Sequence, residues 1–171
     1  LLASVSGFQM FRICQGWLIY EITGSPWSLG LVGAANAIPA IFFNLFGGGF
    51  ADRWDKRRLI ISTQLTTGSL IFLLATLTML GWVESWHVLA VAFLAGGVEA
   101  FDNPARQALY PHLIDRRVMM SAVAMNSSIW QGTRIVAPGI AGILIDLINT
   151  ETAMYISGMG FVVLVAVMAR L

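Results

Sequence analysis

Six stretches of this chain are each long and apolar enough to cross a lipid bilayer, which constrains the fold more than any other feature. A spanning helix needs about 20 mainly apolar residues. The run 59–83 is the clearest stretch, because it contains no Asp, Glu, Lys or Arg. A helix of that length in a soluble protein keeps a polar face. The predicted helices are 1–20, 28–50, 59–80, 86–106, 121–148 and 153–169.

Composition also favours a membrane location. Hydrophobic residues make up 57% of the chain and charged residues 11%, whereas about 25% of residues are charged in soluble proteins. So few charges cannot cover a surface that faces water, but a surface that faces lipid needs no such cover. The net charge of +1 gives no case for nucleic-acid binding, and the single cysteine, Cys14, excludes an internal disulfide. We therefore expect an all-α membrane protein with lipid, and not nucleic acid, among its partners.

Basic residues indicate how the helices cross the membrane. The turns 21–27, 81–87 and 149–152 contain no Lys or Arg, whereas the segments at the opposite ends of the helices are basic. The positive-inside rule places the basic ends in the cytoplasm. The basic residues on that side are Arg53, Lys56, Arg57, Arg58, Arg106, Arg116, Arg117 and Arg170.

One of these cytoplasmic loops has a distinctive spacing. A glycine is followed after three residues by Asp-Arg, and a basic pair follows a few residues later. The pattern resembles the signature loop between helices 2 and 3 of the major facilitator superfamily. A plain basic loop would explain the cations but not this spacing. The matching residues are Gly48, Asp52, Arg53, Lys56 and Arg57, followed by Arg58.

The resemblance implies that this loop is a latch, which holds the two halves of a twelve-helix transporter together on the cytoplasmic side in one transport state. Asp55 stands where the family usually has a second glycine, so a different turn is expected there. Asp tolerates left-handed backbone conformations better than most residues, which makes the exchange less disruptive.

Three further segments, 16–26, 100–109 and 134–142, are similar to exporters related to the enterobactin exporter, the transmembrane secretion effectors. The resemblance covers residues 1–171 and implies an N-terminal six-helix half built from 3+3 inverted repeats. It also implies alternating-access export of a small organic molecule, siderophore or drug-like, from the bacterial cytoplasmic membrane in exchange for protons or another coupling ion. On this view the chain is a fragment that lacks the start of helix 1 and the C-terminal half.

Four ionisable residues lie at depth in the predicted helices: Arg12, Glu99, Asp102 and Arg134. At about 1.5 Å per residue, Arg12 lies roughly 13 Å below the outer end of its helix, and Glu99 and Arg134 roughly 20 Å below theirs. Ionisable residues at such depth are costly and usually functional. In the family fold, helices 1 and 4 line the central cavity and part of helix 5 is nearby. Arg134 is therefore expected to reach Glu99 or Asp102, and Arg12 to reach Glu99.

Two roles fit Glu99. The functional hypothesis makes it a proton-coupling or substrate-contacting carboxylate, because burial disfavours a carboxylate and a nearby guanidinium favours it. The alternative is a static ion pair that keeps helices 4 and 5 in register. Asp102 and Arg106 form an i,i+4 pair near the helix exit. Pro104, between them, is expected to distort that exit.

Small residues and prolines are concentrated in the fifth predicted helix. Such residues allow close packing in lipid or local bending. Rocking points for alternating access and static close packing both remain open. The residues concerned are Gly132, Pro138, Gly139 and Gly142.

No pattern indicates an enzyme, a cofactor or a metal site. There is no nucleotide-binding phosphate loop, and the two histidines, His87 and His112, fall on opposite sides of the membrane. Two other functions remain compatible with the chain. One is a membrane interaction or assembly protein that keeps the fold without transport, and the other is a half-size transporter that works as a dimer.

Overall fold

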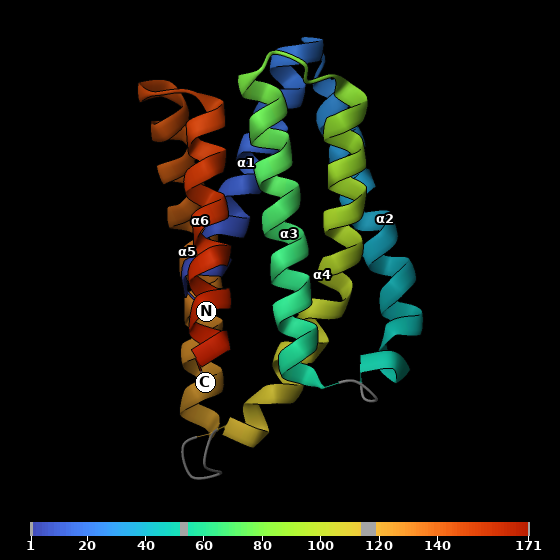
Figure 1. Cartoon of the computed structure of the whole chain (residues 1–171), viewed down its shortest axis with the longest axis vertical. Coiled ribbons are helices and arrows are strands. Elements are labelled where there is room, and N and C mark those ends of the chain that lie inside the picture. Colours follow the sequence, from blue (N-terminus) through green and yellow to red (C-terminus); the bar gives the residue numbers. More distant parts are fainter. Residues whose placement is uncertain (1, 52–54, 114–118, 171) are drawn as a thin grey trace.

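The computed structural model describes residues 2–51, 55–113 and 119–170, and the side chains of 44–51, 107–113, 119 and 170 are not described. These residues form six helices (Figure 1). The all-α prediction is therefore confirmed. The helices are α1 (Leu2–Thr23), α2 (Pro26–Ala51), α3 (Lys56–Met79), α4 (Ser85–Leu113), α5 (Met119–Leu147) and α6 (Thr150–Arg170).

Four of the described helices are long and apolar enough to cross a membrane on their own. The qualifying windows are Pro26–Phe43, Lys56–Met79, Ser85–Arg106 and Thr150–Ala169. The other two helices, α1 and α5, fall below this hydropathy because polar residues are spread along them. Polar side chains inside a bilayer usually face the interior of a bundle or a wet cavity. We therefore expect the polar residues of α1 and α5 to face the bundle interior or a cavity.

The fourth helix is longer than expected, because α4 continues past Arg106 to Leu113. Pro104 does not end it. Instead the last part of α4 turns toward α5 (Figure 1). A proline within a helix causes such a bend because it removes one backbone hydrogen bond. The helix exit is thus bent rather than terminated.

The helices pack in a pattern that repeats within the bundle. Helix α2 packs on α4 as α5 packs on α1, and α6 packs on α1 as α3 packs on α4, while α3 and α6 contact each other. If α1, α2 and α3 exchange places with α4, α5 and α6, each of these pairs becomes another pair of the set, and the pair of α3 with α6 is unchanged. Two inverted three-helix repeats produce this arrangement. Two contacts break the symmetry in the described part: α1 packs on α2 whereas α4 and α5 make few contacts, and α5 packs on α6 whereas α2 and α3 make few contacts.

Glycines allow two of these contacts to be close. A Cβ on Gly96 would overlap the backbone carbonyl of Asn36, so α4 and α2 touch backbone to backbone, and Gly7 meets the carbonyl of Ser157 on α6 in the same way. Small residues have this role where there is no hydrophobic force between helices in lipid.

The packing role expected for the glycines of α5 is not observed among the described residues. A Cβ on Gly132, Gly139 or Gly142 would meet no atom within 4 Å. The reason is that α5 turns a different face to the bundle, where Thr133, Ala137 and Ala141 are buried. A bending role for these glycines and for Pro138, which lies inside α5, stays a prediction.

The start of α3 shows how the basic loop connects to the bundle. The side chain of Asp55 accepts hydrogen bonds from the backbone N–H groups of Arg57 (3.0 Å) and Arg58 (3.2 Å), which makes it the N-cap of α3. Its φ of −59° lies outside the left-handed region, so the position needs no glycine. Capping is a favourable role for Asp, because it satisfies backbone donors that have no partner within the helix.

Arg57 joins the first turn of α3 to the last turn of α6. Its Nε and Nη2 atoms donate to the carbonyl oxygen of Met168 at 2.9 and 2.6 Å. A cation at this position also interacts favourably with the helix macrodipole. Asp52 and Arg53 lie outside the described residues, and the surroundings of Gly48 are not described. The latch role of this loop, including Lys56, therefore stays a prediction.

Replacing Asp55 by alanine is expected to destabilise α3 by about 1 kcal/mol, because two backbone N–H groups lose their acceptor. Thermal unfolding of the purified full-length protein in detergent measures this as a lower Tm. Asp55→Asn is the matched control, since an asparagine side chain also caps helices well. Equal Tm values for the alanine and asparagine variants would contradict the capping role.

Candidate functional site

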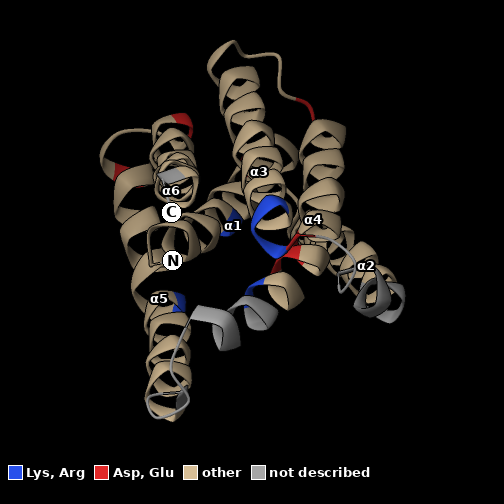
Figure 2. Cartoon of the chain, turned by 60° about the horizontal axis from the view of Figure 1, so that its bottom comes forward, with Lys and Arg blue, Asp and Glu red and all other residues tan. Residues whose placement is uncertain are grey.

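Charged residues lie along α1, α4 and α5 as well as at the ends of the helices. Figure 2 shows blue segments on α1, on α5 and around the forward end of the bundle, with red segments of α4 close by. The visible turns at the far end carry only red segments. The charged residues away from the turns are therefore on α1 and α5, the two less apolar helices, together with α4.

Asp102 is the centre of a hydrogen-bond network between α3 and α4. Its Oδ2 accepts from Nε of Arg106 at 2.6 Å, which is the expected i,i+4 pair. Its Oδ1 accepts from Oγ1 of Thr63 at 2.6 Å and from Nε2 of Gln64 at 3.0 Å. Nη2 of Arg106 also donates to Oγ of Ser4 on α1 at 3.4 Å. This network ties three helices together, and only 8% of the surface of Arg106 is exposed.

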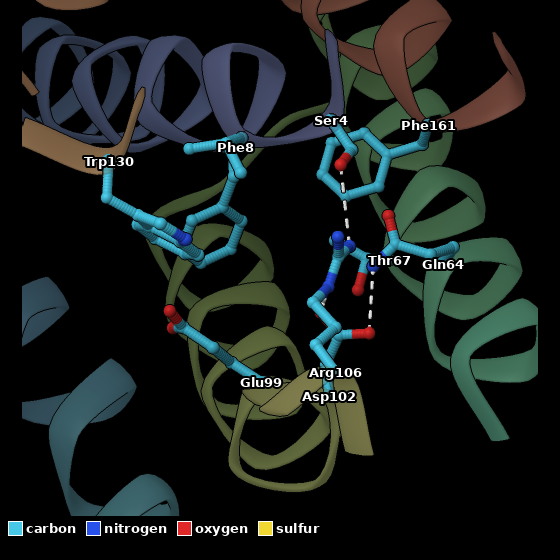
Figure 3. Close-up of a pocket in the computed structure, with 10 residues that line it drawn as sticks. Ser4, Phe8, Gln64, Thr67, Glu99, Asp102, Arg106, Trp130 and Phe161 are labelled. Carbon is cyan, nitrogen blue, oxygen red and sulfur yellow. Dashed lines mark hydrogen bonds and ion pairs between the residues drawn. The ribbon is translucent and has the colours of Figure 1, made fainter. Parts of the chain in front are cut away.

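A small cavity adjoins this network (Figure 3). It measures about 30 Å³, which is enough for a water molecule. Gln64, which is 3% exposed, lines it, and its Oε1 has no hydrogen-bond partner among the described residues. The cavity is lined by Ser4, Val5, Phe8, Gln64, Thr67, Glu99, Asp102, Arg106, Trp130 and Phe161.

Glu99 lines the same cavity but takes no part in the Asp102 network. Its carboxylate points toward Trp130 and Phe8 (Figure 3), and the side chain of Asn103 hydrogen-bonds it. Arg12 and Asp102 are the charged groups near enough to act on it. Arg12 lies on the same face of α1 as Phe8, one turn further along. Glu99 is thus a partly buried carboxylate between one cation and one anion.

A second and larger cavity separates α4 from α5. This cleft measures about 460 Å³. Trp130 and Arg106 line both this cleft and the small cavity. The residues that line the cleft are Asn103 and Arg106 from α4 and Asn126, Ser127, Trp130, Gln131 and Arg134 from α5.

Arg134 does not make the ion pair expected of it. Within the described part of the chain it bonds neither Glu99 nor Asp102. Asp102 already accepts hydrogen bonds from Arg106, Thr63 and Gln64, and its charge is balanced by Arg106. Arg134 instead is exposed toward the cleft.

A model of the transmembrane secretion effector family matches residues 1–171. This chain belongs to the transmembrane secretion effectors of the major facilitator superfamily. Together with the four strongly apolar helices, membership makes it a multi-pass membrane protein. The resemblance seen in the sequence is therefore confirmed.

Characterised relatives include several transporters. The chain is 27% identical to the staphyloferrin A transporter of Staphylococcus aureus over 82% of this chain and 36% of that protein. It is 24% identical to the multidrug efflux pump Tap of Mycolicibacterium fortuitum over 85% and 37%, respectively. A Na⁺, Li⁺, K⁺/H⁺ antiporter of Planococcus maritimus is 32% identical over 68% and 29%. The chain spans about a third of the length of these relatives, and no solved structure matches it significantly.

Several polar residues of the site were not singled out from the sequence of this secretion effector. Thr63 and Gln64 are polar neighbours in a run that is otherwise mostly apolar, and this is the signal that could have found them. Trp130 and Gln131 lie one turn or less from Arg134 on the same helix. A search for polar side chains at helical spacing from each intramembrane charge would have included both.

Proposed function

We propose that this chain forms the N-terminal six-helix half of an efflux transporter that exports a small organic molecule by alternating access in exchange for protons. Efflux pumps and an ion/proton antiporter among its relatives support the proposal. The observation that carries it is the position of Glu99, a partly buried carboxyl beside a water-sized cavity and next to a cleft on the same side of α4.

Glu99 is suited to bind and release a proton in turn. A hydrogen bond from Asn103 and the positive charge of Arg12 favour its charged form, whereas the negative charge of Asp102 disfavours that form. A carboxyl under opposing influences changes its proton affinity when one of them moves away. Rocking of this half against a second one would alter the access of water to Glu99 and the distance to α1, and so couple proton binding to the conformational change.

The proposal includes the orientation in the bacterial cytoplasmic membrane. The basic loops would face the cytoplasm, as the positive-inside rule requires. The loop with Gly48, Asp52 and Arg53 would then lie at the cytoplasmic end of the cavity. Lys56, Arg57 and Arg58 continue it into α3, whose first turn is fixed to α6 through Arg57.

Inverted membrane vesicles that contain the full-length protein test this function. A pH gradient with an acidic lumen is set up and followed by the quenching of 9-aminoacridine. The compounds added are a hydroxycarboxylate, a macrolide, ethidium and NaCl. We expect one of them to dissipate the gradient in these vesicles and not in vesicles that lack the protein. Failure of all four, dissipation by NaCl alone, or uptake of a compound that a protonophore leaves unchanged would overturn the proposal.

A further inference from the structure

The cleft between α4 and α5 has an unusual balance of charge. Its described lining contains the guanidinium groups of Arg106 and Arg134 and no carboxylate. Arg106 is neutralised by its ion pair with Asp102. The remaining intramembrane carboxylate, Glu99, has Arg12 near it. Within the described residues, Arg134 is therefore the intramembrane cation that no nearby carboxylate balances.

The position of Arg134 makes this imbalance costly. It lies near the middle of α5 (Met119–Leu147), at the depth where a bilayer tolerates a charge least. Such a residue normally faces a partner of opposite charge. An anion in the cleft would supply that partner, and a guanidinium can hold a carboxylate through two parallel hydrogen bonds.

The other groups of the cleft also suit an anion that is an organic molecule. Asn103 and Gln131 contribute side-chain amides, whose NH₂ groups can donate to carboxylate or hydroxyl oxygens. Trp130 offers a flat apolar face at the boundary with the small cavity. Aromatic rings of this kind bind planar or apolar parts of a ligand. A volume of about 460 Å³ is within the usual range for small-molecule sites.

We propose that this cleft binds the transported molecule and that the molecule is an organic anion, with a carboxylate held by Arg134 and a planar part against Trp130. This inference rests on the proposed transport function and adds the chemical class of the cargo. It distinguishes the protein from pumps that select lipophilic cations.

Two dyes with the same xanthene ring system test the charge preference. Fluorescein carries a free carboxylate, whereas rhodamine 6G is an esterified cation. Binding to the full-length purified protein is measured by fluorescence anisotropy. We expect fluorescein to bind at least about tenfold more tightly than rhodamine 6G, since a hydrogen bond to a charged group contributes that much to affinity. Equal affinity, or tighter binding of the cation, would overturn the proposal.

Substitution of Arg134 locates the site. Arg134→Gln should weaken fluorescein binding about tenfold or more, whereas Arg134→Lys should retain part of it. Glu84→Gln is the control, because Glu84 is an exposed charged residue outside the cleft. If Arg134 instead pairs with an acidic residue elsewhere in the full-length protein, Arg134→Gln will lower the Tm and leave fluorescein affinity unchanged, which would overturn the assignment.

The binding assay uses no ion gradient, so its outcome is separate from that of the vesicle experiment. Fluorescein binding that depends on Arg134, without any gradient-driven transport, would overturn the proposed function and leave an anion site. Proton-coupled transport of ethidium with no preference for the anionic dye would keep the proposed function and overturn the cargo class.

Discussion

Replacing Glu99 by glutamine is expected to abolish proton-driven transport by the full-length protein while leaving its membrane insertion and stability close to wild type. Glutamine has nearly the same shape and can still bond to Asn103, but it cannot take up or release a proton. The loss should therefore affect the driven process and not the fold. Asp102 would not serve this purpose, because it accepts three hydrogen bonds that hold α3 and α4 together.

Two transport measurements separate coupling from binding. Gradient-driven uptake into inverted vesicles should fall to the level of vesicles without the protein. Exchange of labelled cargo at equal concentrations, with no pH gradient, needs no net proton movement and should be retained. The dependence of this exchange on pH should also become flatter in the variant, because the titrating group is gone.

Glu84→Gln is the matched control for this experiment. Glu84 is an exposed carboxylate in the turn between α3 and α4, where its Oε2 accepts from the indole nitrogen of Trp86 at 2.8 Å. It is remote from both cavities, so its loss should leave driven transport unchanged. A Glu99→Gln protein that keeps gradient-driven transport with an unaltered pH profile would exclude Glu99 as the coupling group and favour a static role.

Features that depend on the solvent could be predicted from the sequence. Backbone groups in lipid must be satisfied within the helix, so apolar length alone predicts where helices form. The pair Asp102–Arg106 could also be predicted, because residues four apart lie on the same face of a helix. Membership in the secretion effector family was visible in the short segments around Asp52, Pro104 and Pro138.

Features that depend on which helix faces which could not be predicted in this way. The glycines of α5 suit close packing, yet α5 presents another face to α1. The close contact of α4 with α2 is made by Gly96, which was not singled out from the sequence. Arg134 was expected to pair across the helices, but Asp102 already has three partners from its own surroundings. A different turn was expected at Asp55, but its role as the N-cap of α3 was not predicted. Each of these outcomes is decided by neighbours distant in sequence or by local competition for donors.

Replacing Gly96 by alanine is expected to destabilise the bundle by about 2–3 kcal/mol, the upper part of the range for overpacked sites. The added Cβ would overlap the backbone carbonyl of Asn36, and a backbone atom cannot move aside as a flexible side chain can. Helix α2 would have to shift away from α4. That shift would also strain a polar link, in which Asn36 donates to Gln15 and Gln15 donates to the carbonyl of Val88, each at 3.4 Å.

Gly16→Ala separates this contact from the general effect of alanine in a helix. A Cβ on Gly16 would lie 3.6 Å from a side-chain carbon of Leu29, which is an ordinary contact. Because alanine favours helix over glycine by up to about 1 kcal/mol, the Gly16→Ala protein should be as stable as wild type or more so. Thermal unfolding of the full-length protein in detergent compares the two variants. If both variants have the same Tm, α2 and α4 are not in backbone contact at Gly96. The pairing of α2 with α4, which leaves α5 free to border the cleft, would then have to be abandoned.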